Sequence, residues 1–521
     1  MSREDALKRF HEHQDAWDVV VIGGGATGVA IAMDAAIRGL SVVLVEQSDF
    51  GKGTSSRSTK LVHGGVRYLQ QGNITLVRDA LRERTLLRAN APHLVYDFPF
   101  VIPCRSWWQR FFYGVGLKVY DFLAVGNSFG RSRNLSVPDT MQAVPGLSRN
   151  RLKGGVLYHD GQFDDARLLI SMVRTGHDAG ACLLNYMRVT GLIRNQNERI
   201  TGVSVCDTES GEEFSIQGRA VINAAGPFSD AIRSMDDYNR DTMISPSQGV
   251  HLVLPRELFP GDTAIIVPKT SDGRVIFVIP WHEHVIVGTT DTPIAEATLE
   301  PEPQQQEVQF LLATVADYLE RAPKPEEVLG YFTGVRPLVR GDKSARTASL
   351  SRDHVIRVST AGLITIAGGK WTTVRKMAED CVDKVVQLHK MAALPCGTEN
   401  YRLHGASDQV VVTDERAVYG TDLVHLQQLE QQQPALAKPI SAAFGITAAQ
   451  VIWAVRQEMA RTVEDVLARR TRALFLDARA SVAMAPEVAA LLAEELGHEA
   501  GWCQTQVAEF KEVAKNFLPA S

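Results

Sequence analysis

Residues 18–46, DVVVIGGGATGVAIAMDAAIRGLSVVLVE, decide the class of fold. The apolar run 19–22 is typical of a parallel strand that is buried on both faces. Three glycines with the spacing G-x-G-x-x-G follow it, and then come a helical pattern and a second apolar strand, 42–45. This order of strand, glycine turn, helix and strand predicts a Rossmann-like unit that binds a dinucleotide.

Each glycine of the turn has an expected task. Gly23 makes the tight turn, Gly25 lets the backbone approach a pyrophosphate, and Gly28 lets the helix pack closely. The helix N-terminus, with Thr27 in its first turn, would face the phosphates. Glu46 ends the second strand, where a carboxylate can accept hydrogen bonds from a ribose. An acid at this position favours NAD or FAD over NADP.

The composition bounds the class of protein. A chain of 521 residues predicts two or three domains. With a net charge of −5, the sequence gives no electrostatic case for nucleic-acid binding. The six cysteines are scattered without zinc-ligand spacing, so free thiols in a reducing compartment are expected and no metal site is predicted. The N-terminus lacks the features of a secretory signal, which favours a cytoplasmic protein.

The rest of the chain contains two further kinds of structure. Strand signals at 251–255, 275–280 and 284–290 indicate an antiparallel sheet inserted into the α/β frame. The last part of the chain, in contrast, is strongly helix-forming. We therefore predict an α/β fold in which a Rossmann-like cofactor domain carries an inserted antiparallel-sheet cap domain and a helical C-terminal domain.

Two late βα signals bear on which dinucleotide is bound. Two later segments look like further strands of the same sheet. They are 220–227, AVINAAGP, and the unit that begins GLITIAGGKWTTVRKM at 362. The helix that opens near Thr372 could face the pyrimidine end of a flavin and stabilise negative charge there. A further βα unit without this role is the alternative, so the spacing leaves FAD and NAD both open.

A polar stretch, GTSSRSTKLVHGGVRYL at 53–69, has no regular helix or strand pattern. Its hydroxyls and backbone N–H groups are suited to a pyrophosphate and a ribityl chain, and Gly64-Gly65 would let the backbone pass a flavin ring closely. The candidate cofactor ligands in this stretch are Thr54, Ser55, Ser58, Thr59, Lys60 and Leu61.

At these motifs the chain resembles the FAD-dependent glycerol-3-phosphate dehydrogenases. The matching pieces include the glycine fingerprint, TSSRSTKLVHGGVRYL, DGQFDDARLL, NAAGP, VGTTDT, GVRPL, SRDH and GGKWTT, in family order. The resemblance implies FAD, oxidation of sn-glycerol 3-phosphate to dihydroxyacetone phosphate, and electron transfer to a membrane quinone. The cofactor domain is then expected at 16–90, 150–235 and 355–390, the cap domain at 91–149 and 236–354, and the helical domain at 391–521.

The resemblance also implies roles for single residues. Arg336 and Arg352 are expected to bind the substrate or its phosphate, because an arginine fork suits phosphate oxygens. Lys370 is expected beside the flavin. His63 and His251 are the two candidate proton acceptors, and His251 is also a candidate substrate ligand. The remaining expected contacts are Arg67, Tyr68 and Thr290 for the substrate and Gly226 and Gly369 for the cofactor.

Several alternatives stay open at this point. They are a glycerol-3-phosphate oxidase that uses O2, an amine or amino-acid oxidase of the same fold, and a non-catalytic FAD-binding scaffold. The paired arginines and the stretch 53–69 argue against the amine or amino-acid oxidase. The sequence leaves open whether the chain forms a homodimer. The aromatic and basic segment 105–125 could lie in a membrane interface, but its stripe Trp108, Phe112, Val115, Val119 and Phe122 is typical of a helix that faces the core, which we favour.

Overall fold

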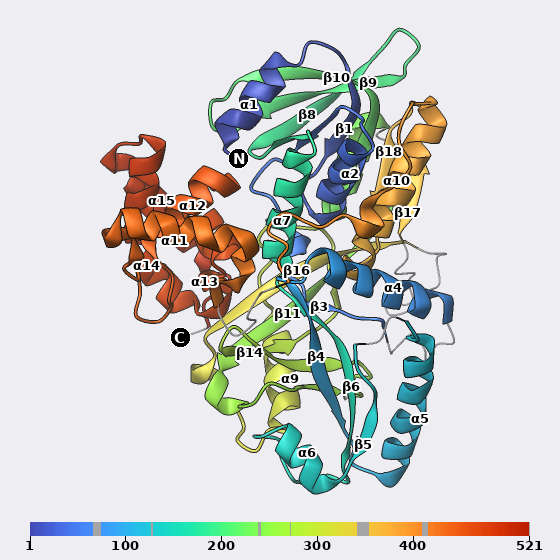
Figure 1. The fold of residues 1–521 in the computed structure, drawn as a ribbon, viewed down its shortest axis with the longest axis vertical. Coiled ribbons are helices and arrows are strands. Elements are labelled where there is room, and N and C mark those ends of the chain that lie inside the picture. Colours follow the sequence, from blue (N-terminus) through green and yellow to red (C-terminus); the bar gives the residue numbers. More distant parts are fainter. Residues whose placement is uncertain are drawn as a thin grey trace.

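The computed structural model describes residues 1–65, 74–126, 129–237, 241–270, 272–340, 354–408 and 415–519. Two sheets and a group of C-terminal helices make up the molecule, with the first sheet in the upper part of Figure 1 and the second below it. The predicted fold class is confirmed: a Rossmann-like sheet, a largely antiparallel second sheet and a helical C-terminal region are all present.

The first sheet has the order β17-β18-β10-β1-β2-β7, and β9 and β8 extend it from β10. Its members are β1 (Trp17–Ile22), β2 (Val42–Val45), β7 (Cys182–Leu184), β8 (Met187–Arg194), β9 (Ile200–Asp207), β10 (Glu213–Asn223), β17 (Val355–Val358) and β18 (Ile364–Ala367). The strands β7, β2, β1, β10 and β18 run parallel, whereas β17 and β9 pair in the antiparallel sense.

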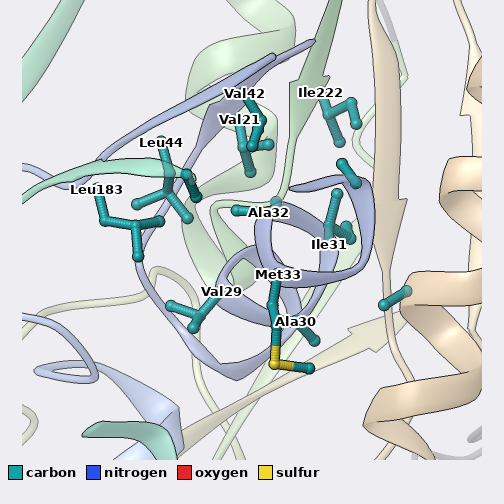
Figure 2. Close-up of a cluster of buried hydrophobic side chains, with 14 of the residues drawn as sticks. Val21, Val29, Ala30, Ile31, Ala32, Met33, Val42, Leu44, Leu183 and Ile222 are labelled. Atoms are coloured by element: carbon teal, nitrogen blue, oxygen red, sulfur yellow. The ribbon is translucent and has the colours of Figure 1, made fainter. Parts of the chain in front are cut away.

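Helix α2 (Ala26–Ile37) packs on this sheet between α7 (Asp165–Asp178) and α10 (Val374–His389). Figure 2 shows its side chains, such as Ile31 and Ala32, against Val21 and Ile222 of the central strands. Nearly every residue of α2 is buried, because the sheet lies on one side and helices on the other. The apolar sequence of the first strand and helix is thus explained by burial on all faces.

The second sheet has the order β15-β11-β14-β13-β12-β4-β6-β3, with β16 on β11 and β5 on β6. Its members are β3 (Leu61–Val62), β4 (Val95–Pro103), β5 (Arg133–Leu135), β6 (Gly155–Phe163), β11 (Ile244–Pro255), β12 (Ala264–Val267), β13 (Ile276–Trp281), β14 (His284–Gly288), β15 (Thr292–Pro293) and β16 (Gly330–Val339). Strand β6 lies in a segment that we assigned to the cofactor domain, yet it pairs with β4 in this sheet. The domain boundaries themselves stay predictions.

The remaining described α-helices pack against the two sheets or form the C-terminal group. They are α1 (Arg3–Glu12), α4 (Ile74–Asn90), α5 (Trp107–Leu123), α6 (Val137–Ala143), α8 (Ser229–Asp236), α9 (Gln305–Ala316), α11 (Leu423–Gln432), α12 (Ala448–Glu458), α13 (Ala473–Leu476), α14 (Ala478–Leu496) and α15 (Ala500–Ala514). The C-terminal helices share one apolar core with Phe332 and Trp281 of the second sheet. They are therefore packed against the cap rather than tethered beside it.

Helix α5 contradicts the expectation that its aromatic stripe faces the core. Trp108 is 70% exposed and Phe122 is 76% exposed, and the rest of the stripe is also exposed. The buried face of α5 is instead Gly114, Leu117 and Tyr120. Because both faces of this helix carry apolar residues, their periodicity alone did not distinguish the inner face from the outer one. Within the described ranges, no helix is long and apolar enough to cross a bilayer.

Candidate active site

A cavity of about 610 Å³ lies between the two sheets. On one side it is lined by residues at the carboxyl ends of β1, β2, β10 and β18, and on the other by residues of β11 and β16. The carboxyl ends of parallel strands are where open α/β sheets bind their ligands. The predicted residues that line the cavity are Gly23, Gly25, Thr27, Glu46, Thr54, Ser55, Ser58, Thr59, Leu61, His63, Gly226, His251, Arg336, Gly369 and Lys370.

The glycine turn brings the start of α2 to the cavity. Gly25 is the N-cap of α2 and offers no side-chain acceptor to the first N–H groups. A Cβ on Gly28 would stand 1.9 Å from the Gly23 carbonyl oxygen, so Gly28 serves close packing behind the cavity wall. The turn therefore presents backbone donors and a helix N-terminus, which suit a pyrophosphate.

Glu46 lies at the end of β2 and lines the same end of the cavity. Its carboxylate accepts hydrogen bonds from the backbone N–H of Gly24, at 2.6 Å, and of Ser48, at 3.0 Å. Burial raises the pKa of Glu46, against the opposing effect of these two bonds. The carboxylate thus supports the glycine turn, and its predicted contact with a ribose stays a prediction.

Residues 51–61, here called the cofactor loop, form a second wall and are held from several directions. The Thr54 hydroxyl donates to the Val335 carbonyl oxygen of β16, at 2.5 Å. The Ser55 hydroxyl accepts from the N–H of Ala26, and the Ser55 carbonyl accepts from the Trp371 indole, both at 2.9 Å. The loop is thereby tied to α2, to the cap and to the turn after β18.

Two predicted cofactor ligands of this loop use their side chains elsewhere. The Ser58 hydroxyl donates to Asp165 Oδ2, at 2.7 Å, and Lys60 Nζ donates to the same oxygen, also at 2.7 Å. Lys60 is fully buried and does not line the cavity. Burial and the neighbouring Arg472 charge lower the pKa of Lys60 to about 7, against the effect of Asp165. The Lys60 side chain therefore lies behind the loop and does not reach the cavity in which the cofactor is expected.

Arg336, on β16, is one of the arginines that line the cavity, together with Arg57 and Arg188. It donates to the Thr290 carbonyl oxygen at 2.9 Å and to Asp291 Oδ1 at 3.2 Å. Its side chain retains 25% exposure. These contacts orient the guanidinium at the wall of the cavity, where an anion could bind to it.

The hydroxyl of Thr290, a predicted substrate ligand, lies behind Arg336. It donates to Glu307 at 2.7 Å and accepts from the Val250 N–H, and Thr290 is buried without lining the cavity. Its predicted substrate contact is therefore not supported, and its carbonyl serves to hold Arg336.

His251, on β11, lines the cavity and contacts the cofactor loop. Its Nε2 is 2.9 Å from the Thr59 hydroxyl oxygen, and its ring stacks on Phe332 at 4.4 Å between centroids. Burial, together with the charges of Lys60 and Arg336, lowers the pKa of His251 well below its usual value. The imidazole is therefore neutral at physiological pH and can accept a hydrogen bond, and the same lowered pKa makes it a weak proton acceptor.

The turn after β18 supplies the other candidates. Gly369 has a φ of 79° and is followed by Lys370, which lines the cavity at the start of a short 3-10 helix. The backbone N–H of His63 donates to the Thr372 hydroxyl at 3.2 Å, which places His63 against the same turn. The predicted residues Arg67, Tyr68 and Arg352 lie outside the described residues.

Sequence reasoning missed the carboxylate that organises the cofactor loop. Asp165 begins α7 and accepts from the loop and from Arg472, although these segments are distant along the chain. The motif DGQFDDARLL contains Asp165 and was quoted for the resemblance, but nothing in it identifies the partners of this carboxylate. Trp371, which binds the loop through Ser55, was also missed.

Comparisons with known proteins agree with this geometry. Residues 18–375 match the family model described as FAD dependent oxidoreductase, and residues 364–503 match the C-terminal domain of alpha-glycerophosphate oxidase. The fold and the site thus define a FAD-dependent oxidoreductase, as predicted, and its cofactor is FAD.

Relatives narrow the class further. The mitochondrial glycerol-3-phosphate dehydrogenase of Rattus norvegicus is 39% identical over 99% of this chain and 75% of its own length. The mitochondrial glycerol-3-phosphate dehydrogenase of Arabidopsis thaliana is 38% identical over 97% of this chain and 86% of its own length. The glycerol-3-phosphate dehydrogenase of Bacillus halodurans complexed with FAD has a TM-score of 0.81 and 30% identity, covering 99% of this chain and 98% of that one. The chain belongs to the FAD-dependent glycerol-3-phosphate dehydrogenase family.

Proposed function

We propose that the protein oxidises sn-glycerol 3-phosphate to dihydroxyacetone phosphate and passes the electrons to a quinone. The observation that carries the substrate assignment is the position of Arg336 in the same cavity as His251 and Lys370. A guanidinium suits the phosphate, because it donates parallel hydrogen bonds to two oxygens. The substrates named for the relatives support the same assignment.

The protein residues have separable tasks in this reaction. FAD, when bound, accepts the hydride from C2 of the substrate. Arg336 binds and orients the phosphate, and Lys370 provides positive charge where the oxygen on C2 becomes a carbonyl. The C2 hydroxyl must lose a proton, for which the neutral His251 imidazole and His63 are the candidate acceptors. The Thr59 hydroxyl, which lines the cavity and contacts His251 Nε2, can pass this proton to the ring.

Anaerobic reduction of the bound flavin tests the substrate. We expect sn-glycerol 3-phosphate to bleach the flavin absorbance at about 450 nm, whereas glycerol, lactate and sarcosine leave it unchanged at equal concentration. Glycerol serves as the matched control, because it lacks only the phosphate that Arg336 would bind. Bleaching by sarcosine alone would make the protein an amine oxidase, and bleaching by none of the four would favour the non-catalytic scaffold.

The electron acceptor is tested in air. With a short-chain quinone present, we expect rapid turnover, and without one we expect only slow peroxide release. Steady peroxide production at the quinone-supported rate would instead make the protein an oxidase, the activity named by the family model of its C-terminal domain.

We also propose that the outer face of α5 docks on a lipid bilayer, where a quinone dissolves. Trp107, Trp108, Phe111 and Phe122 are each more than half exposed, on one helix. Exposed basic residues lie nearby: Arg131 and Arg133 follow the helix, and Lys118 is on it. A helix with an exposed aromatic face and basic residues is suited to the interface of an anionic membrane.

Replacing two of these side chains should weaken membrane binding. For the double variant Trp108→Ser/Phe122→Ser, we expect about 100-fold weaker partition onto vesicles that contain phosphatidylglycerol, since burying the two aromatic rings contributes about 3 kcal/mol in total. Leu394→Ser is the matched control, because Leu394 is 65% exposed but lies away from α5. Vesicle sedimentation measures the effect, and equal partition of both variants and the wild type would contradict docking by α5.

A further inference from the structure

The segment 468–472, which reads ARRTR, carries buried arginines from the helical C-terminal region to the cofactor loop. Arg470 forms a two-pronged ion pair with Asp49, at 2.7 and 2.8 Å, and Arg469 binds the same carboxylate. Asp49 lies two positions before the loop begins. One end of the cofactor loop is therefore fastened to the C-terminal region by a buried charge cluster.

The other end of the loop is fastened through Asp165. Asp165 Oδ2 accepts from the Ser58 N–H, from the Ser58 hydroxyl and from Lys60 Nζ. Asp165 Oδ1 accepts from Arg472 at 2.9 Å, and the same Arg472 nitrogen donates to the Ser56 carbonyl oxygen at 3.0 Å. Arg472 thus binds the turn 56–60 both directly and through the carboxylate.

The turn needs this support. Lys60 has a φ of 63°, in the left-handed region that L-residues rarely adopt. Its ammonium also donates to the Ser56 carbonyl oxygen at 2.8 Å, so Lys60 and Arg472 share two acceptors. The positive charge of Arg472 disfavours the protonated form of Lys60, and the Asp165 carboxylate, which both side chains contact, favours it.

The turn carries a group of the active site. Thr59 lies between Ser58 and Lys60, and its hydroxyl contacts His251 Nε2 at the cavity wall. The Phe332 ring stacks on His251 and lies 5.0 Å from Lys60 Nζ. A shift of the turn would therefore move Thr59 relative to His251.

We propose that Arg472 is a positioning residue: through Asp165 it holds the turn 56–60 so that Thr59 and His251 keep their alignment beside the flavin. The helical C-terminal region then acts on catalysis by bracing the cofactor loop, without itself touching the substrate. The kinetic part of this proposal rests on the proposed function, whereas the part on FAD binding does not.

The test compares three variants of the full-length holoenzyme. Arg472→Ala removes the brace, Arg472→Lys restores a positive charge facing Asp165, and Arg461→Ala is the control. Arg461 also joins the C-terminal region to the cofactor domain, through Glu209 at 2.9 Å, but it does not contact the loop. The measured quantities are the FAD dissociation constant, the anaerobic rate of flavin reduction by glycerol 3-phosphate, and the dissociation constant of that substrate.

For Arg472→Ala we expect flavin reduction at least about tenfold slower, because small displacements of catalytic groups have large effects on rate. The substrate dissociation constant should stay within about threefold, since Arg336 is untouched. FAD should bind more weakly, Arg472→Lys should recover much of the rate, and Arg461→Ala should resemble the wild type.

Equal losses in the Arg472→Ala and Arg461→Ala proteins would overturn the proposal, because they would indicate general loosening of the C-terminal region. A wild-type reduction rate and FAD affinity in Arg472→Ala would overturn it too. If Arg472→Ala does not fold, Ser58→Ala takes its place, because it removes a hydrogen bond between the same turn and Asp165. An unchanged rate of flavin reduction in Ser58→Ala would then contradict the proposal. If glycerol 3-phosphate does not reduce the wild type, the proposed function fails, and the FAD dissociation constants still test the brace.

Discussion

The Arg336→Ala protein is expected to lose about 100-fold or more in kcat/KM for glycerol 3-phosphate while it keeps its FAD. Two charge-assisted hydrogen bonds to the phosphate, at about 1.5 kcal/mol each, correspond to a loss of about 3 kcal/mol. We expect the flavin site to remain intact. Loss of Arg336 does not leave the Asp291 carboxylate without a partner, because Asp291 keeps its hydrogen bond from the Ser247 hydroxyl.

Steady-state kinetics with an artificial electron acceptor, together with the flavin content of the purified protein, measure this effect. Arg340→Ala is the matched control: Arg340 follows the same strand and is exposed, so its loss should change kcat/KM by less than about twofold. Arg336→Lys should fall between the two, because an ammonium keeps the charge but not the parallel donors. Unchanged kinetics in Arg336→Ala would show that Arg336 does not bind the substrate.

The parts of the fold that sequence predicted are those in which neighbours in space are also neighbours in the chain. Strand β1, the glycine turn and α2 follow one another directly, so one window of sequence contains the strand, the turn and the packing face. The second sheet is different, since β4 pairs with β12 across more than a hundred residues. No local sequence pattern specifies such a pairing. For the same reason, the sequence did not predict that β6 pairs with β4.

The candidate site shows the same division. Arg336, His251 and Lys370 were assigned to the pocket by resemblance, and all three line the cavity. Lys60 was assigned by its place in a polar stretch, but its direction is set by Asp165, which is distant in sequence. Side-chain direction within an irregular loop depends on such partners, which is why a motif can locate a loop at a cofactor without specifying which of its side chains face it.

The Gly28→Ala protein is expected to lose FAD affinity by about 100-fold and to unfold more readily. Gly28 lies in the third position of α2, and an added Cβ would stand 1.9 Å from the Gly23 carbonyl oxygen, which is backbone and cannot rotate away. Either the helix must move outward or the glycine turn must open. Both movements carry the backbone donors away from the pyrophosphate, and overpacking of about 3 kcal/mol corresponds to that loss of affinity.

Gly501→Ala is the matched control for this substitution. Gly501 also lies in the first turn of a helix, α15, and a Cβ there would meet no atom within 4 Å. Alanine is the better helix former, so this variant should be as stable as the wild type or slightly more stable. Thermal unfolding and the ratio of FAD to protein measure both variants. If Gly28→Ala retains wild-type FAD content and melting temperature, α2 can withdraw from the turn without cost, and the close contact between Gly28 and Gly23 is not what shapes the dinucleotide site.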